Sequence, residues 1–163
     1  MHIRRLTPAD ALLYRALRLR ALRDHPDAFT SSWEDDRSQP VEAAAQRLAA
    51  HAFWGAYRGG ELVGIVGLER EPRAKSRHKA SVVGMYVAPE AAGRGVGRAL
   101  LEALLAHARA EGIASLVLTV TEGNAQARRL YAAAGFRSFG VEPDAMRVDG
   151  LSYAKNHMHL GLA

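Results

Sequence analysis

A buried-type strand that runs through a glycine-rich turn into a helix constrains this chain most. The apolar run 82–87 is followed by Pro89, which begins a turn. Three glycines then stand at alternate positions, Gly93, Gly95 and Gly97. Glycine permits positive φ angles and lets a ligand approach the main chain closely. Since a helix start has unpaired N–H groups and positive potential, the segment predicts a site for a phosphate or pyrophosphate.

Two common nucleotide-binding motifs do not fit this segment. A Walker A loop requires Gly-Lys-Ser/Thr, and the segment contains no lysine. The dinucleotide motif G-x-G-x-x-G would need glycine where Arg98 or Leu100 stands. The remaining alternative is a strand–turn–helix connection whose glycines serve packing alone.

The segment resembles motif A of the GNAT acyltransferases, which bind acetyl-CoA. That motif reads Gln/Arg-x-x-Gly-x-Gly/Ala, and Gly95-Val96-Gly97 matches its second half, with Ala92 at the leading position. A second stretch, 124–136, is similar to the family's Asn-x-x-Ala-x-x-x-Tyr-x-x-x-Gly-Phe. The resemblance implies an acetyl-CoA-dependent N-acetyltransferase in which a small-molecule or peptide amine attacks directly in a ternary complex.

The family likeness also assigns expected roles to individual residues. Tyr131 would protonate the departing CoA thiolate as a general acid. The main-chain N–H of Met85 would hold the thioester oxygen, and Val87 would pair with the pantetheine arm in the manner of an added strand. Asn124 is either a pantetheine contact or a plain helix N-cap. The full set of expected cofactor contacts is Met85, Tyr86, Val87, Ala92, Gly93, Arg94, Gly95, Val96, Gly97, Arg98, Asn124, Ala127 and Tyr131.

The general base is less clearly marked. Relatives carry a glutamate at positions that align here with Ser81 or Thr119, and neither residue is a carboxylate. Glu69, at a strand end, is the favoured substitute. The alternatives are Glu34, Glu122 and His78, or no dedicated base. The missing carboxylates also leave open a module that binds acyl-CoA as a sensor without catalysis.

The acceptor site is expected around an acidic, aromatic stretch. Phe29, Trp33 and Glu34 stand where the family lines this site, and Asp35 and Asp36 follow. Carboxylates there would suit a cationic amine, whereas the alternative is a solvated loop with two core aromatics. His157 and His159 lie two apart on one strand face, but without cysteine or an acidic pair no metal site is predicted.

The pattern of elements predicts one α/β domain over residues 1–163, with a mixed, largely antiparallel sheet of six or seven strands, a splayed parallel pair and about four helices, as in the GNAT fold. Strands are expected at 2–6, 53–57, 62–69, 82–87, 115–121, 136–141 and 152–162. Helices are expected from Thr7 to His25, over 41–50, from the glycines to Gly112, and from Asn124 to Gly135. A loop around Pro143-Asp144 would separate the final strands.

Composition narrows the possible partners. A net charge of +5 favours an anionic ligand such as CoA. Arg15, Arg18, Arg20 and Arg23 are interpreted as a solvated helix surface, and no nucleic-acid recognition motif is found. Because the N-terminal residues lack an apolar core and no long apolar run occurs, a cytoplasmic protein without a membrane segment is expected. The final strands are where a homodimer would form.

Overall fold

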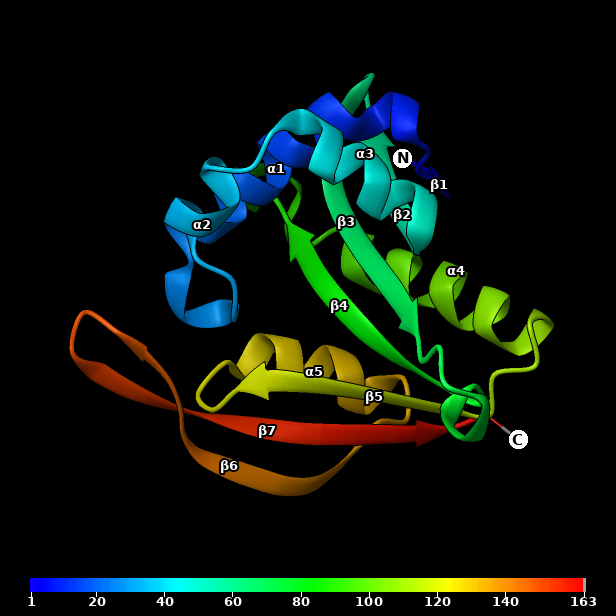
Figure 1. Cartoon of the computed structure of the whole chain (residues 1–163), viewed down its shortest axis with the longest axis vertical. Coiled ribbons are helices and arrows are strands. Elements are labelled where there is room, and N and C mark those ends of the chain that lie inside the picture. The colour runs from blue at the N-terminus through cyan, green and yellow to red at the C-terminus, as the bar shows by residue number, and fades with distance from the viewer. Residues whose placement is uncertain (163) are drawn as a thin grey trace.

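The computed structural model describes residues 1–162 and is organised around one seven-stranded sheet (Figure 1). The strands are β1 (His2–Arg5), β2 (Ala52–Arg58), β3 (Glu61–Arg70), β4 (Lys79–Val87), β5 (Ser115–Thr121), β6 (Arg137–Val148) and β7 (Leu151–Gly161). The α-helices are α1 (Ala11–Asp24), α2 (Trp33–Arg37), α3 (Val41–Ala50), α4 (Val96–Ala110) and α5 (Ala125–Ala133).

The strand order is β1-β2-β3-β4-β5-β7-β6, and every neighbouring pair is antiparallel except β4 and β5. The parallel pair is joined only over Lys79–Ser81 on β4 and Ser115–Val117 on β5. Beyond these residues the two strands diverge, as Figure 1 shows. The predicted mixed sheet with a splayed parallel pair is confirmed.

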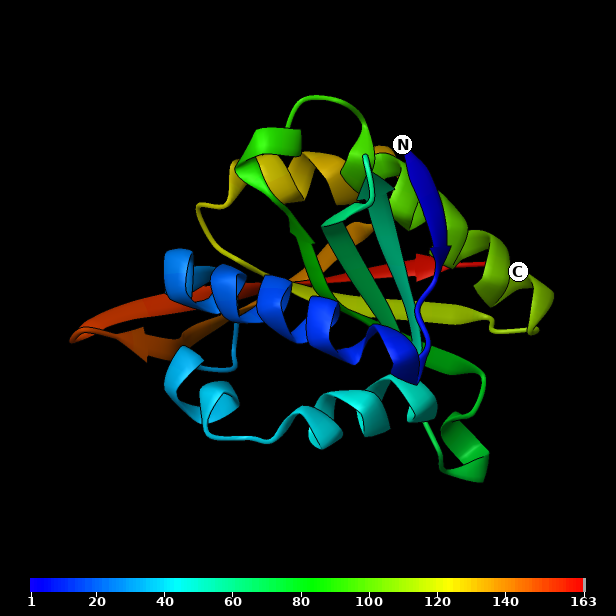
Figure 2. The ribbon, with the colours of Figure 1, turned by 90° about the horizontal axis from the view of Figure 1, so that it is seen from above.

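Helices cover both faces of the sheet. α1 and α3 lie on one side and pack against each other, whereas α4 and α5 lie on the other side (Figure 2). α4 presents a continuous apolar stripe to β2 and β3, with Leu100 and Leu104 fully buried. Burying both faces explains why the central strands read as nearly unbroken apolar runs.

Glycine and aspartate fix the two hairpin turns. The turn between β2 and β3 lies at Gly59-Gly60, and both residues have positive φ, 57° and 82°. The loop predicted around Pro143-Asp144 is wrong, because β6 continues through it as an irregular stretch and ends at Val148. The hairpin instead turns at Asp149-Gly150, with φ of 50° and 77°. Asp-Gly favours the type I′ turn whose twist matches that of paired strands.

The N-terminal segment is held by the buried carboxylate of Asp10. It accepts hydrogen bonds from Nη2 of Arg4 at 2.7 Å and from the main-chain N–H of Thr7 at 2.8 Å. The Arg4 guanidinium, followed by the Thr7 amide, holds the pKa of Asp10 well below its usual range. The carboxylate therefore stabilises the fold fully above its unfolded pKa of about 3.9, and this stabilisation is lost as the pH falls toward the folded value.

Replacing Asp10 with Asn should lower the free energy of unfolding at pH 7 by about 2 kcal/mol, because charge-assisted hydrogen bonds are lost. The difference from the parent protein should shrink as the pH is lowered below about 4, because the unfolded parent then binds a proton at Asp10 while the folded parent does not. Urea denaturation at pH 7 and at a pH below about 4 measures this difference in the free energy of unfolding. An equal difference at both pH values would show that Asp10 does not act through its charge.

Candidate active site

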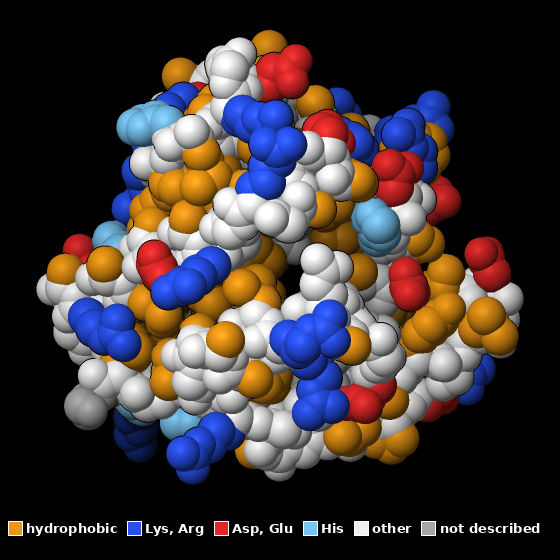
Figure 3. All heavy atoms as spheres, turned by 180° about the vertical axis from the view of Figure 1, so that it is seen from behind, with side chains coloured by type: hydrophobic (Ala, Val, Ile, Leu, Met, Phe, Trp, Pro, Cys, Tyr) orange, Lys and Arg blue, Asp and Glu red, His pale blue; other side chains and the backbone are white. Residues whose placement is uncertain are grey.

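The diverging ends of β4 and β5 enclose a cavity of about 250 Å³. Its walls include Val82–Met85 of β4, Thr119–Thr121 of β5, and residues of α5, the 28–31 segment and β7. On the face that carries α4 and α5, the surface is hollowed near its centre and basic side chains lie around the hollow (Figure 3). Past Ser81 the main-chain groups of β4 that face β5 have no partner strand, so they are available to a ligand.

A β-bulge on β4 shapes the cavity wall. Ile65 pairs with Tyr86 and Gly67 pairs with Val83, so β4 carries one extra residue in this interval. Gly84 occupies it with φ of 63°, a left-handed conformation that a side chain would strain. The bulge lies directly before Met85, which lines the cavity.

The glycine loop follows the end of β4, and its residues lie outside the lining of this cavity. Gly93 and Gly95 have φ of 73° and 75°, and no atom lies within 4 Å of the position that a Cβ would take on either residue. The first intrahelical bond of α4 runs from the Ala99 N–H to the Gly95 carbonyl, at 3.0 Å. The amides of the preceding helical residues are left without an intrahelical acceptor. A Cβ on Gly97 would lie 3.3 Å from Leu130 of α5 and 3.7 Å from Val87 of β4.

The predicted loop residues differ in exposure. Ala92, Gly93, Arg94 and Gly95 are exposed, whereas the Val96 side chain is buried in the core. Only the main chain of Val96 can therefore face a ligand. Arg98 is exposed and paired with Glu102 at 2.9 Å, on the solvent side of α4. The side chains of this loop leave the main chain accessible.

α5 and its N-cap contribute three predicted residues to the cavity wall: Asn124, Ala127 and Tyr131. The Asn124 side chain caps the helix by accepting a hydrogen bond from the Ala127 N–H at 3.2 Å. The Tyr131 side chain is buried, and its ring packs edge-on against Phe136 with centroids 5.9 Å apart. Burial raises the pKa of Tyr131 above its ordinary value of about 10, so the phenol stays protonated at neutral pH.

Glu69 is the carboxylate that the structure brings to the cavity. It lies near the end of β3 and pairs with Nη2 of Arg47 at 3.0 Å. Among the described residues that line the cavity, it is the only acidic side chain. Glu34 and His78 do not line it. Glu122 is also outside, and its carboxylate accepts a hydrogen bond from Asn156 at 2.8 Å.

The residues predicted for the acceptor site are divided by the structure. Phe29 lines the cavity and packs against Tyr86, with ring centroids 6.4 Å apart. Trp33 and Glu34 lie on the short helix α2, outside the cavity wall. The Trp33 ring is covered instead by the Arg37 guanidinium, 4.8 Å from the ring centroid. The stretch expected as a loop becomes a helix because Ser32 caps it, accepting from the Asp35 N–H at 3.0 Å.

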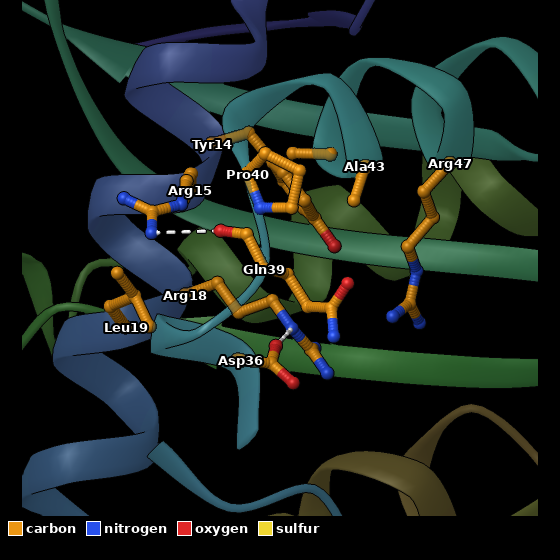
Figure 4. Close-up of a pocket in the computed structure, with 10 residues that line it drawn as sticks. Tyr14, Arg15, Arg18, Leu19, Asp36, Gln39, Pro40, Ala43 and Arg47 are labelled. Carbon is orange, nitrogen blue, oxygen red and sulfur yellow. Dashed lines mark hydrogen bonds and ion pairs between the residues drawn. The ribbon is translucent and has the colours of Figure 1, made fainter. Parts of the chain in front are cut away.

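The prediction of a wholly solvated arginine surface on the first helix is wrong for Arg18. Its side chain is only 11% exposed, and its Nε donates to Asp36 at 2.5 Å. Arg18 and Arg47 line the main cavity and also a second hollow of about 140 Å³ between α1 and α3. Figure 4 shows both guanidinium groups extending toward the same part of this hollow. The Tyr14 hydroxyl beside it is buried and has no hydrogen-bond partner within residues 1–162.

Sequence reasoning missed three cations of the cavity wall: Arg18, Arg47 and Lys155. No motif marks them, and only the fold brings α1, α3 and β7 to the same place.

Across the described chain, no group of three His, Cys, Asp or Glu residues is arranged to hold a metal ion. His157 and His159 bond instead to Glu142 and Ser115. No helix in residues 1–162 has the length and apolar character of a membrane span.

Comparison with known proteins gives consistent matches. The sequence model of the acetyltransferase (GNAT) family matches residues 18–136. Mycothiol acetyltransferase of Thermobispora bispora is 35% identical over 137 residues, covering 82% of this chain and 45% of that protein. This chain therefore spans about half the length of the mycothiol acetyltransferases that it matches. Aminoglycoside N(6')-acetyltransferase type 1 of Stenotrophomonas maltophilia is 35% identical over 141 residues, covering 82% of this chain and 84% of that protein.

A solved structure shows the same architecture. The Salmonella typhimurium protein yncA, solved with its cofactor acetyl-CoA, has a TM-score of 0.89 and 23% identity, and the match covers 100% of this chain and 94% of that one. At this level of identity the likeness bears on the fold alone. It agrees with the divergent parallel pair and with the placement of helices on both faces of the sheet.

Proposed function

The chain belongs to the acetyltransferase (GNAT) family, and from this premise we propose that it transfers an acetyl group from acetyl-CoA to an amine within a ternary complex. The observation that carries the proposal is the unpaired edge of β4 at the Gly84 bulge, which shares one cavity with Tyr131 of α5. Solved neighbours that contain acetyl-CoA support the choice of cosubstrate. The curated relatives include an aminoglycoside N(6')-acetyltransferase and an N-alpha-acetyltransferase, so a small-molecule amine and a peptide amine both remain acceptor classes.

The main chain fits the cofactor at two places. The open left-handed glycines and the unpaired amides at the start of α4 would hold the pyrophosphate, with Arg94 beside them. The free edge of β4 at Met85 and Val87 would receive the pantetheine arm as an added strand. When bound, acetyl-CoA supplies the acetyl group as a thioester, which an amine can attack.

Three groups of this chain would act on the reaction. The Met85 N–H would donate to the carbonyl oxygen and stabilise the negative charge that develops there. Glu69 would take a proton from the attacking amine, directly or through water, as the C–N bond forms. Tyr131, kept protonated by burial, would give its proton to the sulfur as the C–S bond breaks.

Glu69→Gln should lower kcat by about 100-fold if this carboxylate accepts the proton, a typical contribution for general base catalysis. The rate of this variant should still rise with pH, because raising the pH deprotonates the amine without help from the enzyme. The matched control is Glu122→Gln, outside the cavity. A Glu69→Gln enzyme with unchanged kcat at neutral pH would remove Glu69 from the reaction.

The test of the proposal is a screen of amines with acetyl-CoA, read as free thiol. The panel contains amino acids and their amides, polyamines, aminoglycosides and peptides with free N-termini. Thiol release that depends on the amine is expected. Acetyl-CoA binding without release for any amine would favour the alternative, a sensor of acyl-CoA.

A further inference from the structure

The cavity holds a buried cation without a carboxylate partner. Lys155 extends from β7 into the cavity wall and is only 9% exposed. Its Nζ donates to the Thr30 hydroxyl, and an ammonium group has further donors beyond that one. Within the described residues, no Asp or Glu lies within ion-pair distance of it. Glu142 faces Lys155 across β6 and β7, but its carboxylate pairs with His157 at 2.9 Å. The ammonium therefore lacks a direct counter-ion, and burying such a charge is costly.

The charges of the cavity wall do not cancel. Arg47 is neutralised by Glu69, and Arg18 is neutralised by Asp36, which lies outside the cavity wall. Lys155 is the remaining charge, so the site carries an excess positive charge. The acidic stretch that would attract a cationic amine is engaged elsewhere or exposed on α2. An acceptor with a negative charge matches this wall better than a polyamine or an aminoglycoside.

Two of these cations flank one short segment. Lys155 bonds to Thr30, and Nη2 of Arg18 donates to the hydroxyl of the next residue, Ser31, at 3.1 Å. Nη1 of Arg18 lies 3.7 Å from the position that a Cβ on Gly84 would take. Arg18 therefore reaches the bulge directly before Met85, where the carbonyl of the thioester would be held.

We propose that Lys155 supplies the charge of an anion subsite, that Arg18 supplies a further N–H donor to it, and that the acceptor is a free α-amino acid. In such an acceptor the nitrogen lies roughly 2.5 Å from the carboxylate carbon, so binding the carboxylate beside the Gly84 bulge brings the amine to the reacting centre. Glu69, on the adjoining strand β3, lines the same cavity and can receive the amine proton. This inference rests on the proposed acetyl transfer and specifies its substrate class.

Matched pairs of amino acids and their primary amides test the proposal. They differ in charge at the carboxylate but share the amine and the side chain. Each compound is assayed at a pH that gives the same fraction of unprotonated amine. Under these conditions kcat/KM for the preferred acid should exceed that for its amide at least tenfold, since the amide lacks the charge-assisted contact. A preference for the amides, or for aminoglycosides or polyamines over every amino acid, would overturn the anion subsite while leaving acetyl transfer intact.

Lys155→Met keeps the length of the side chain and removes its charge. In this variant the KM for the acid should rise at least tenfold, the preference over the amide should fall below about threefold, and CoA affinity should not change. Lys155→Arg should retain the preference. If Lys155 instead accepted the amine proton, Lys155→Arg would lose kcat with the preference unchanged, and the proposal would fail. Circular dichroism and thermal unfolding establish that both variants fold.

Direct binding separates this inference from the proposed function. Calorimetric titration of N-acetyl amino acids and their amides into the CoA-loaded protein should show tighter binding of the acids, and Lys155→Met should abolish the difference. If no amine in the screen releases thiol, the proposed acetyl transfer is wrong, and these titrations alone decide whether the anion subsite exists. Equal affinity for acids and amides in the parent protein would refute it.

Discussion

Tyr131→Phe should reduce kcat by about 100-fold or more, because the departing sulfur loses its proton donor, while the Kd for CoA changes less than threefold. The ring, its packing on Phe136 and the shape of the cavity are retained. Single-turnover release of thiol, with CoA affinity from calorimetry, measures the two quantities separately. Since burial raises the pKa of Tyr131, its deprotonation should not limit the parent rate below about pH 10.

The matched control for this variant is Tyr153→Phe, which removes a tyrosine hydroxyl from β7 outside the cavity wall. It should leave kcat within about twofold of the parent, as surface substitutions away from the site usually do. If Tyr131→Phe retains the parental kcat, the proton must reach the sulfur from water or from another group, and Tyr131 has no catalytic role.

Gly97→Asp should weaken CoA binding by about 100-fold, close to 2.8 kcal/mol, by placing a negative charge beside the diphosphate and a side chain between Val87 and Leu130. The same change should alter the stability of the protein little. An acidic residue in the first turn of a helix is favourable, and aspartate is a better helix former than glycine, whereas the 3.3 Å contact of the new Cβ with Leu130 opposes these gains. Calorimetry should therefore show a large loss of CoA affinity while thermal unfolding shows only a small shift.

Gly97→Asn separates charge from size, because it has the same shape without the charge. It should weaken CoA binding by about tenfold, and raising the salt concentration should reduce the difference between the Asp and Asn variants. Equal CoA affinity in the Asp variant and the parent would mean that the diphosphate does not lie at the start of α4.

Local patterns predicted much of the fold. The helix at 41–50 and the strand at 115–121 coincide with α3 and β5. The Asn124 cap and the apolar stripe of α4 also follow the prediction, since capping and helical periodicity are local properties. The prediction for the last hairpin is wrong because it places the turn at Pro143, a residue typical of loops, rather than at Asp149-Gly150. Pairing between β6 and β7 carries the strand through the proline as an irregularity.

The candidate site was predictable only where its groups lie within a contiguous sequence motif. The glycine loop, Met85 and Tyr131 lie in two contiguous stretches of sequence, so their spacing is visible. The wall formed by Arg18, Arg47 and Lys155 depends on long-range contacts between α1, α3 and β7. Arg18 was misinterpreted because its partner, Asp36, lies on a helix that local sequence did not predict.

Calorimetric titration of the purified protein with acetyl-CoA tests most directly whether this chain binds a thioester cofactor along β4 and at the start of α4. The expected result is saturable binding of one molecule per chain with a Kd below about 1 mM, greatly weakened by Gly97→Asp and unaffected by Tyr131→Phe. Absence of binding at millimolar acetyl-CoA, or full affinity in the Gly97→Asp protein, would contradict it.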